Sequence, residues 1–197
     1  TPTANEEAWA DVTGATAAPG GTGGLNMFHY STSSLMDGVK LSASYTPSDG
    51  TTEVESSSDY GIEYTGYEGL TIGAAQGEDN SAAATIETTT MYATFAMDSF
   101  TVGYQASEDD SETASADVDF NAIGVSYAVS DDMSVSLNSS THDYEDASLS
   151  DQEALGISIS YTMGSMTLTA NHNTIDNIAG ASDTDRSGYA MSLGFAF

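Results

Sequence analysis

Large apolar residues alternate with small or polar ones along most of the chain. The pattern is clearest at the C-terminal end, where every second residue is large and apolar: Tyr189, Met191, Leu193, Phe195 and Phe197. Successive side chains of a strand point to opposite faces, so a period of two predicts a strand with one apolar and one polar face. Eleven such segments occur between residues 25 and 197, and no helical period separates them. The sequence therefore predicts an all-β protein.

The connections between these segments alternate in kind. One set is tight and supplies the Asp and Gly that hairpin turns favour: 36–38, 66–69, 97–99, 130–132 and 163–165. The other set is long, acidic and rich in Ser and Thr: 46–59, 76–85, 106–117, 139–151 and 172–185. Because the two kinds alternate strictly, we expect antiparallel strands with all the tight turns at one end of the sheet and all the long loops at the other.

The compositions of the two faces favour a membrane environment. One face carries Leu, Ile, Val, Met, Tyr and Phe, whereas the other carries mostly Ser, Thr, Gly, Ala and Asn. A soluble sheet places long charged residues on its polar face and Lys at its edges, and these are almost absent from the eleven segments. If the apolar face meets lipid, every backbone group needs an internal partner and the sheet has to close. The sequence thus predicts a transmembrane antiparallel β-barrel around a water-filled lumen.

Composition excludes several other classes of protein. Acidic residues number 30 and basic residues 2, and the formal charge of -28 excludes nucleic-acid binding, which needs clustered Lys and Arg. The chain has no Cys, so disulfides and Cys-based zinc sites are excluded. The sequence contains no apolar run of about 18 residues, so it predicts no transmembrane helix. The three His are scattered, and no nucleophile or phosphate-binding motif occurs, so we do not expect an enzyme.

The last strand, 188–197, resembles the terminal signature of the general porins of Gram-negative outer membranes, which ends in an aromatic residue preceded by alternating apolar positions. The alternating turns and loops extend this resemblance over residues 25–197. The resemblance implies that Tyr189, Met191, Leu193, Phe195 and Phe197 form the signal read by the barrel assembly machinery. It also implies a homotrimer in the bacterial outer membrane, in contact with the lipid bilayer and lipopolysaccharide, without a resident cofactor.

The strand count carries a further expectation. Bacterial single-chain barrels have even numbers of strands, and porins of this kind have about 16. We therefore expect the eleven strands of 25–197 to be the C-terminal part of a longer chain whose N-terminal part is missing. In the family, the long constriction loop follows the fifth strand, so residues 1–24 would be its remnant, with Glu6, Glu7 and Asp11 at the constriction. The alternative for residues 1–24 is a disordered tail.

The alternation places three charged residues on the polar face of their strands, and they are predicted to line the pore: Lys40, Glu63 and Arg186. Because pore selectivity follows the field of the lining charges, the scarcity of bases predicts a preference for cations. Lys40 is expected near a short turn and Arg186 near the long loops. A surface ion pair with Asp183 or Asp185 is an equally good interpretation of Arg186.

One acidic loop suggests calcium binding. It contains Glu108, Asp109, Asp110 and Glu112, and calcium prefers several carboxylate oxygens. The stretch does not match the spacing of a calcium-binding loop, and diffuse screening by cations is the alternative.

These patterns together predict an outer-membrane porin: a water-filled, cation-preferring channel for passive diffusion of small hydrophilic solutes and ions. The alternative is a secreted acidic structural β-protein, such as an adhesin, a filament or a surface-layer subunit. A third possibility is a closed barrel that serves as an anchor without a pore.

Overall fold

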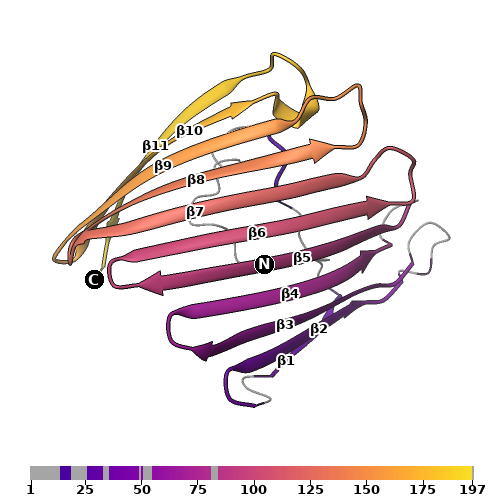
Figure 1. Ribbon diagram of the computed structural model, residues 1–197, viewed down its shortest axis with the longest axis horizontal. Helices are drawn as coiled ribbons and strands as arrows, with labels where there is room; N and C mark the ends of the chain where they lie inside the picture. Colours follow the sequence, from indigo (N-terminus) through magenta and orange to yellow (C-terminus); the bar gives the residue numbers. More distant parts are fainter. Residues whose placement is uncertain are drawn as a thin grey trace.

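A single antiparallel sheet of eleven strands makes up the fold (Figure 1). The computed structural model describes residues 14–18, 26–32, 36–48, 50, 55–80 and 84–196. Each strand pairs with its neighbours in sequence, from β1 to β11. The strands are β1 (Phe28–Ser31), β2 (Val39–Thr46), β3 (Ser57–Tyr67), β4 (Leu70–Asp79), β5 (Ile86–Met97), β6 (Phe100–Ser111), β7 (Val118–Ser130), β8 (Met133–Tyr144), β9 (Gln152–Met163), β10 (Met166–Asp176) and β11 (Arg186–Phe195). A short 3-10 helix, η2 (Ile178–Gly180), lies between β10 and β11.

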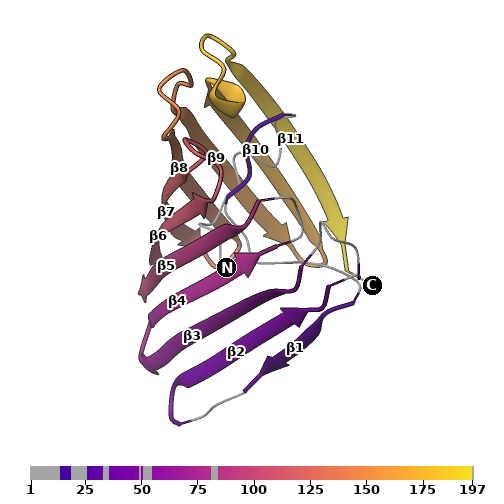
Figure 2. The same cartoon turned by 90° about the vertical axis from the view of Figure 1, so that its right-hand side faces the viewer.

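The sheet is strongly curved. In Figure 2, β1–β3 and β10–β11 lie on opposite sides of the space that the sheet partly encloses. Over the described residues β1 and β11 are the two edges and do not pair with each other, so the sheet is an open wall with a concave and a convex face. The predicted all-β antiparallel fold is confirmed.

Two-residue turns join the strands at one end of the sheet, as predicted. They are Glu68-Gly69, Asp98-Ser99, Asp131-Asp132 and Gly164-Ser165. Positive φ angles occur at Gly69 (76°), Asp98 (52°) and Gly164 (61°), which is the conformation that tight hairpin turns favour. At Gly69 a Cβ atom would lie 2.2 Å from the carbonyl oxygen of Ala96, so this turn has no room for a side chain.

The strands extend further toward the long loops than the sequence pattern predicts. Residues 76–85, 106–117, 139–151 and 172–185 were expected to be loops, yet β4, β6, β8 and β10 continue to Asp79, Ser111, Tyr144 and Asp176. Acidic side chains do not interrupt the backbone ladder: Thr88 and Asp109 are register partners, and Thr88 Oγ1 donates a hydrogen bond of 2.6 Å to Asp109 Oδ1. Loss of apolar alternation therefore marks the edge of the apolar belt rather than the end of a strand.

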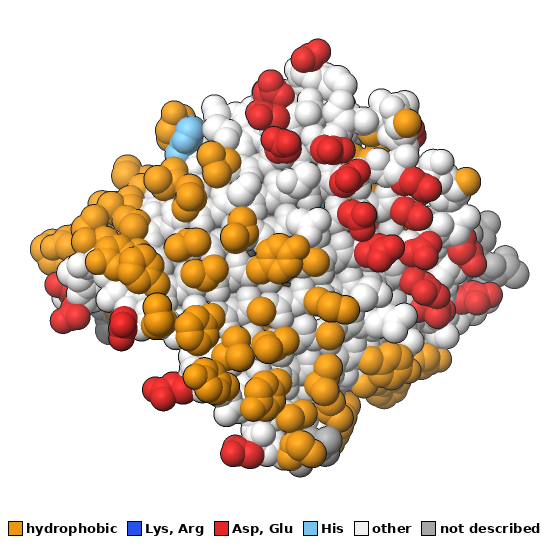
Figure 3. Space-filling view, in the orientation of Figure 1, with side chains coloured by type: hydrophobic (Ala, Val, Ile, Leu, Met, Phe, Trp, Pro, Cys, Tyr) orange, Lys and Arg blue, Asp and Glu red, His pale blue; other side chains and the backbone are white. Residues whose placement is uncertain are grey.

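Burial is inverted relative to a soluble protein. The convex face carries a broad belt of apolar side chains (Figure 3), and among them Ile123, Leu155 and Ile157 are about half exposed at 50%, 49% and 54%. The concave face instead buries polar side chains, including Gln105, His142 and Gln152. Among the described residues, no helix has the length and apolar character needed to cross a bilayer.

Candidate functional site

The polar concave face is the candidate site, and strand register arranges its side chains in lateral rows. Directly paired residues of antiparallel strands share a face. One such row, here called the Lys40 row, crosses ten strands through Lys40, Glu63, Gly73, Tyr92, Gln105, Ala122, Ser140, Ala154, Ile175 and Arg186. It contains all three residues that the sequence assigned to the pore lining, with the two bases near opposite edges of the sheet.

Glu63 is held by a tyrosine that lies flat across the sheet. Tyr92 OH donates a hydrogen bond of 2.7 Å to Glu63 Oε2, over the intervening strand β4. The ring passes over Gly73, where a Cβ atom would lie 2.3 Å from it, so only glycine permits this contact. Lys40 is the register partner of Glu63, but no ion pair or hydrogen bond joins its ammonium group to the described residues.

A second row lies closer to the long loops. This Asp59 row runs through His29, Ser44, Asp59, Gly77, Thr88 and Asp109. Ser44 Oγ donates a hydrogen bond of 2.8 Å to Asp59 Oδ2, and the other carboxylate oxygen lies over Gly77, 2.3 Å from where a Cβ atom would be. The sequence prediction of the pore lining missed Asp59 and Asp109. Asp59 could have been found, because Asp59 and Glu63 both alternate with the apolar residues Tyr60 and Ile62 and therefore point to the polar face.

Two hollows join these rows into one groove. The larger, of about 330 Å³, is lined by His29, Ser44, Asp59 and Thr88, among others. The smaller, of about 210 Å³, is lined by Lys40, Glu63 and Tyr92, among others. Both are lined by Ser42, Gly61 and Ala75. We call this continuous depression on the concave side of β1–β5 the β2–β5 groove.

The other half of the concave face is a neutral wall. A cavity of about 430 Å³ near the short turns is lined mainly by hydroxyl side chains of β6–β10: Thr101, Ser126, Ser134, Ser136, Ser158, Ser160 and Thr169. Of the described residues that line it, Asp98 alone is charged, and it lies in the turn between β5 and β6. The charges of the concave face are thus concentrated on β2–β6, with Arg186 on β11 apart from them.

Residues 14–18 dock on the concave face near the long loops. The amide N–H of Thr16 donates to Gln152 Oε1 (2.9 Å), and Gln152 Nε2 donates to the Thr16 carbonyl (3.1 Å). His142 Nε2 lies 3.1 Å from the carbonyl oxygen of Ala17, which can only accept, so Nε2 carries the proton. His142 Nδ1 then accepts from Gln152 Nε2 at 3.2 Å. The hydroxyls of Thr16 and Tyr144 lie 2.8 Å apart. Four polar contacts therefore hold a segment that is 128–136 residues away in sequence from Tyr144 and Gln152.

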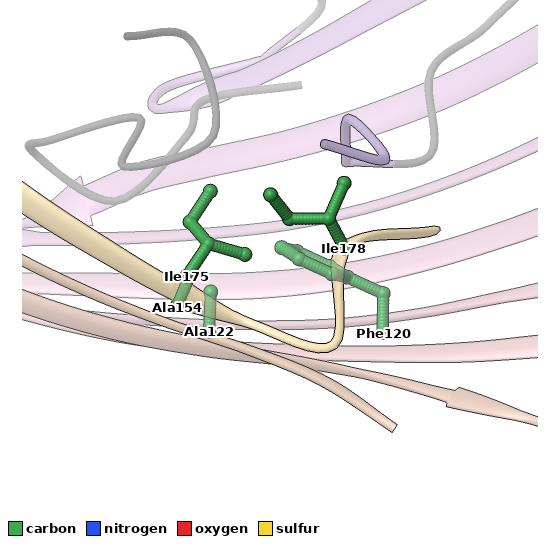
Figure 4. Packing of buried hydrophobic residues seen from close by; sticks show 5 residues of the cluster. All are labelled: Phe120, Ala122, Ala154, Ile175 and Ile178. Carbon is green, nitrogen blue, oxygen red and sulfur yellow. The ribbon is translucent and has the colours of Figure 1, made fainter. Parts of the chain in front are cut away.

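An apolar cluster supports this contact (Figure 4). It consists of Phe120, Ala122, Ala154, Ile175 and Ile178, and Ala15 and Ala18 pack against it. Phe120 and Ile175 are fully buried on the face that is otherwise polar. These two residues depart from the predicted distribution of apolar side chains because they contact the docked segment rather than water.

The four residues of the calcium hypothesis do not converge. Glu108 and Asp110 lie on the convex face, Asp109 lies on the concave face, and Glu112 follows the end of β6. Among the described residues, no three His, Asp or Glu side chains are placed to hold a metal ion together. Glu108 and Asp110 instead belong to a convex acidic rim at the long-loop end of the sheet (Figure 3), which also includes Glu87, Asp119, Asp143 and Glu153.

Several members of this rim oppose one another directly. Glu87 is the register partner of Asp110, and Asp119 is the register partner of both Glu108 and Asp143. Beyond the strands, Asp146 adds a further carboxylate, and hydrogen bonds from the side chain and the backbone of Ser148 hold the pKa of its carboxyl below the ordinary value. Negative charge thus accumulates on this end of the protein.

The remaining predicted residues fall into two groups. Tyr189, Met191, Leu193 and Phe195 lie on the convex face of β11, where Tyr189 is 81% exposed and stacks on His172 with ring centroids 4.2 Å apart. Glu6, Glu7, Asp11 and Phe197 lie outside the described residues. The assembly signal and the acids of the constriction stay predictions.

Known proteins resemble the chain in sequence pattern and in fold. The family model described as Gram-negative porin matches residues 2–177. No curated protein sequence matches the chain. Among solved structures, an anion-selective porin from Comamonas acidovorans superposes with a TM-score of 0.75 at 13% identity, over 97% of this chain and 64% of that porin.

Two further structures agree. OmpF of Salmonella typhi, in complex with daunomycin, gives a TM-score of 0.67 at 11% identity, over 95% of this chain and 69% of OmpF. The trimer form of OmpT, an outer-membrane protein of Vibrio cholerae, gives 0.64 at 12% identity, over 86% of this chain and 64% of OmpT. At these identities the likeness concerns the fold, and the chain spans less than two thirds of the Comamonas porin.

Proposed function

The chain belongs to the Gram-negative porin family of the bacterial outer membrane, and from this membership we propose that it forms the wall of a water-filled channel. The channel would let small hydrophilic solutes and ions diffuse passively, without covalent chemistry. The observation that carries the proposal is the inverted burial: apolar side chains cover the convex face, and hydroxyl, amide and charged side chains cover the concave face. In a bilayer, only this arrangement puts lipid outside and water inside.

Conductance tests this proposal. The protein purified from outer membranes should form discrete ion-conducting steps in planar bilayers, and it should need detergent in solution and migrate differently on gels before and after heating. A detergent-independent, monodisperse protein would instead be the secreted structural β-protein. A detergent-dependent protein without conductance would be an anchor.

We propose that the pore prefers cations. Four of the described carboxylates, Asp59, Glu63, Asp79 and Asp109, lie on the concave face of β3–β6, against one base, Lys40, on the neighbouring strand β2. In a salt gradient the reversal potential should therefore indicate cation selectivity, and Glu63→Gln should reduce it. The Comamonas porin is anion-selective by its description, but 13% identity does not transfer that property. An anion-selective reversal potential would contradict this part of the proposal.

We also propose that residues 1–24 belong to the loop that narrows the pore, with Glu6, Glu7 and Asp11 at the constriction and Lys40, Glu63 and Arg186 on the wall. The docking of residues 14–18 on the concave face supports this assignment. Because the chain has no Cys, single Cys substitutions at these positions can be probed individually. A charged thiol reagent added to the aqueous phase should change conductance at each position, whereas modification without any change would argue against a pore lining.

For the assembly we propose a homotrimer surrounded by lipopolysaccharide, by analogy with OmpT of Vibrio cholerae, which has been described in a trimer form. Light scattering of the detergent-solubilised protein measures the number of chains directly. A monomer would refute the trimer without affecting the channel.

A further inference from the structure

The β2–β5 groove has the features of a solute-binding site as well as of a wall. Its two hollows, of about 330 and 210 Å³, are continuous through Ser42, Gly61 and Ala75. Sites for small molecules have volumes of about 300 Å³ and above, with a few placed polar groups. The smaller hollow lies toward the short turns and the larger toward the long loops, so an occupant that fills both would be elongated along the strands.

The floor of the groove is built from glycines. Gly61, Gly73 and Gly77 have neighbouring side chains where their own would be: Ser42, Tyr92 and Asp59. A Cβ atom at each position would lie 2.8, 2.3 and 2.3 Å from the nearest atom of those neighbours. Polar groups therefore lie flat on the wall, and a solute in the groove would meet the hydroxyl and carboxylate groups of these neighbours.

The two ends of the groove differ in charge: the end near the short turn holds Lys40 beside Glu63, and the other end holds Asp59. At the end near the short turn, Lys40 has no ion-pair partner among the described residues, and the carboxylate of its register partner Glu63 accepts the hydroxyl of Tyr92. At the other end lies Asp59, the register partner of Ser44. Ser44 is four residues beyond Lys40 on β2, which at about 3.3 Å per residue separates the two positions by about 13 Å.

This separation suits a particular class of solute. An extended peptide spans about 3.3–3.6 Å per residue, so three or four residues place its terminal carboxylate and ammonium about 10–14 Å apart. We propose that the β2–β5 groove binds short zwitterionic peptides of three or four residues, with the peptide carboxylate at Lys40 and its ammonium at Asp59. Such a peptide complements both ends, whereas a dianion would meet Asp59 and Glu63 and a dication would meet Lys40.

The inference rests on the proposed function in one respect: the groove has to face the water-filled lumen. Calorimetry on the detergent-solubilised protein measures binding without any need for conductance. Tetra-alanine is the probe, at about 0.1 M salt, where the screening length is about 10 Å. Its fully capped analogue, with acetylated N-terminus and amidated C-terminus, has the same backbone length and no charge. Tetra-alanine should bind at least about threefold more tightly than this analogue, a modest ratio because exposed charge pairs are weak.

Single variants test which end of the peptide binds at Lys40 and which binds at Asp59. Lys40→Gln should weaken the binding of tetra-alanine about threefold and leave the binding of tetra-alanine amidated at its C-terminus unchanged. Asp59→Asn should weaken the binding of tetra-alanine and leave the binding of its N-acetylated form unchanged. Arg186→Gln is the matched control, because Arg186 lies in the Lys40 row near the opposite edge of the sheet. Unchanged heat-modifiable mobility verifies that each variant folds. Equal binding of the capped peptide, or an equal effect of Arg186→Gln, would overturn the site.

Current recordings complete the test. Tetra-alanine should block the open channel at the concentrations at which it binds, and Lys40→Gln should raise the half-blocking concentration. Binding without any conductance would refute the channel and support the groove as a peptide site. Conductance without binding or block would refute the peptide site alone.

Discussion

Replacing Gln152 by Met should release residues 14–18 from the concave face while the sheet stays intact. Gln152 is completely buried, and its amide makes four hydrogen bonds: two with the backbone of Thr16, one with His142 Nδ1 and one with the amide N–H of Ala179. Met has a similar length and volume, so the substitution removes these bonds without opening a large cavity.

The magnitude follows from the groups that are left unpaired. The N–H and carbonyl of Thr16 both lose a partner, and because both are partly buried, each unpaired group should cost about 1 kcal/mol, the lower end of the range for buried groups. The docked state should therefore lose about 2 kcal/mol or more, which is a factor of about 30 in the equilibrium between docked and released segment. The contacts of Ala15 and Ala18 with the apolar cluster remain, so release is not expected to be complete.

Hydrogen exchange measured by mass spectrometry reports this equilibrium directly. The Thr16 amide, whose N–H donates to Gln152, should exchange about 30-fold faster in Gln152→Met, whereas β-strand amides should keep their protection. Asn138→Ala is the matched control: Asn138 is a buried amide on the same face, but among the described residues neither its nitrogen nor its oxygen has a hydrogen-bond partner. If Gln152→Met exchanges at the wild-type rate, or if Asn138→Ala has the same effect, the assigned network does not hold the segment.

Two further predictions concern the sheet itself. Ile157→Lys, in the convex apolar belt, should lower the free energy of unfolding in lipid vesicles, measured by urea titration, by about 2–4 kcal/mol. Ser160→Lys, on the concave face of the same strand, should lower it by less than about 1 kcal/mol. Equal losses would contradict the assignment of the two faces. Gly69→Ala should lower stability by about 1–3 kcal/mol more than Gly164→Ala, because both have positive φ but only Gly69 meets a backbone atom, at 2.2 Å. Equal losses at the two turns would show that the Ala96 carbonyl moves aside without cost.

The faces and turns of the sheet could be predicted because they depend on local sequence. Along β9, Leu155, Ile157 and Ile159 alternate with small residues, and the structure places these three on the convex face. The strand ends could not be predicted in the same way. Beyond the belt the strands lie in water, where Asp109 and Glu108 keep the backbone ladder without leaving an apolar pattern in the sequence.

The docking of residues 14–18 was beyond the reach of sequence reasoning. Gln152 and Thr16 are 136 residues apart, and a single Gln carries no local signal of its role. One signal was nevertheless available. Phe120 and Ile175 are large apolar residues that the alternation places on the polar, lumen-facing side of their strands. In a barrel, such residues indicate that another segment of protein packs against the inner wall. The same argument identifies Asp59 as a lining residue, because it shares the parity of Glu63.

The convex acidic rim limits how far the protein can move along the membrane normal. Its carboxylates lie directly beyond the apolar belt, so a displacement that brings Asp110 or Asp119 into hydrocarbon would have to neutralise or desolvate them. At the opposite end, Asp98, Asp131 and Asp132 in the two-residue turns oppose a shift in the other direction. Acidic residues at both ends thus fix the depth at which the sheet sits in the bilayer, and with it the height of each lining residue relative to the two membrane surfaces.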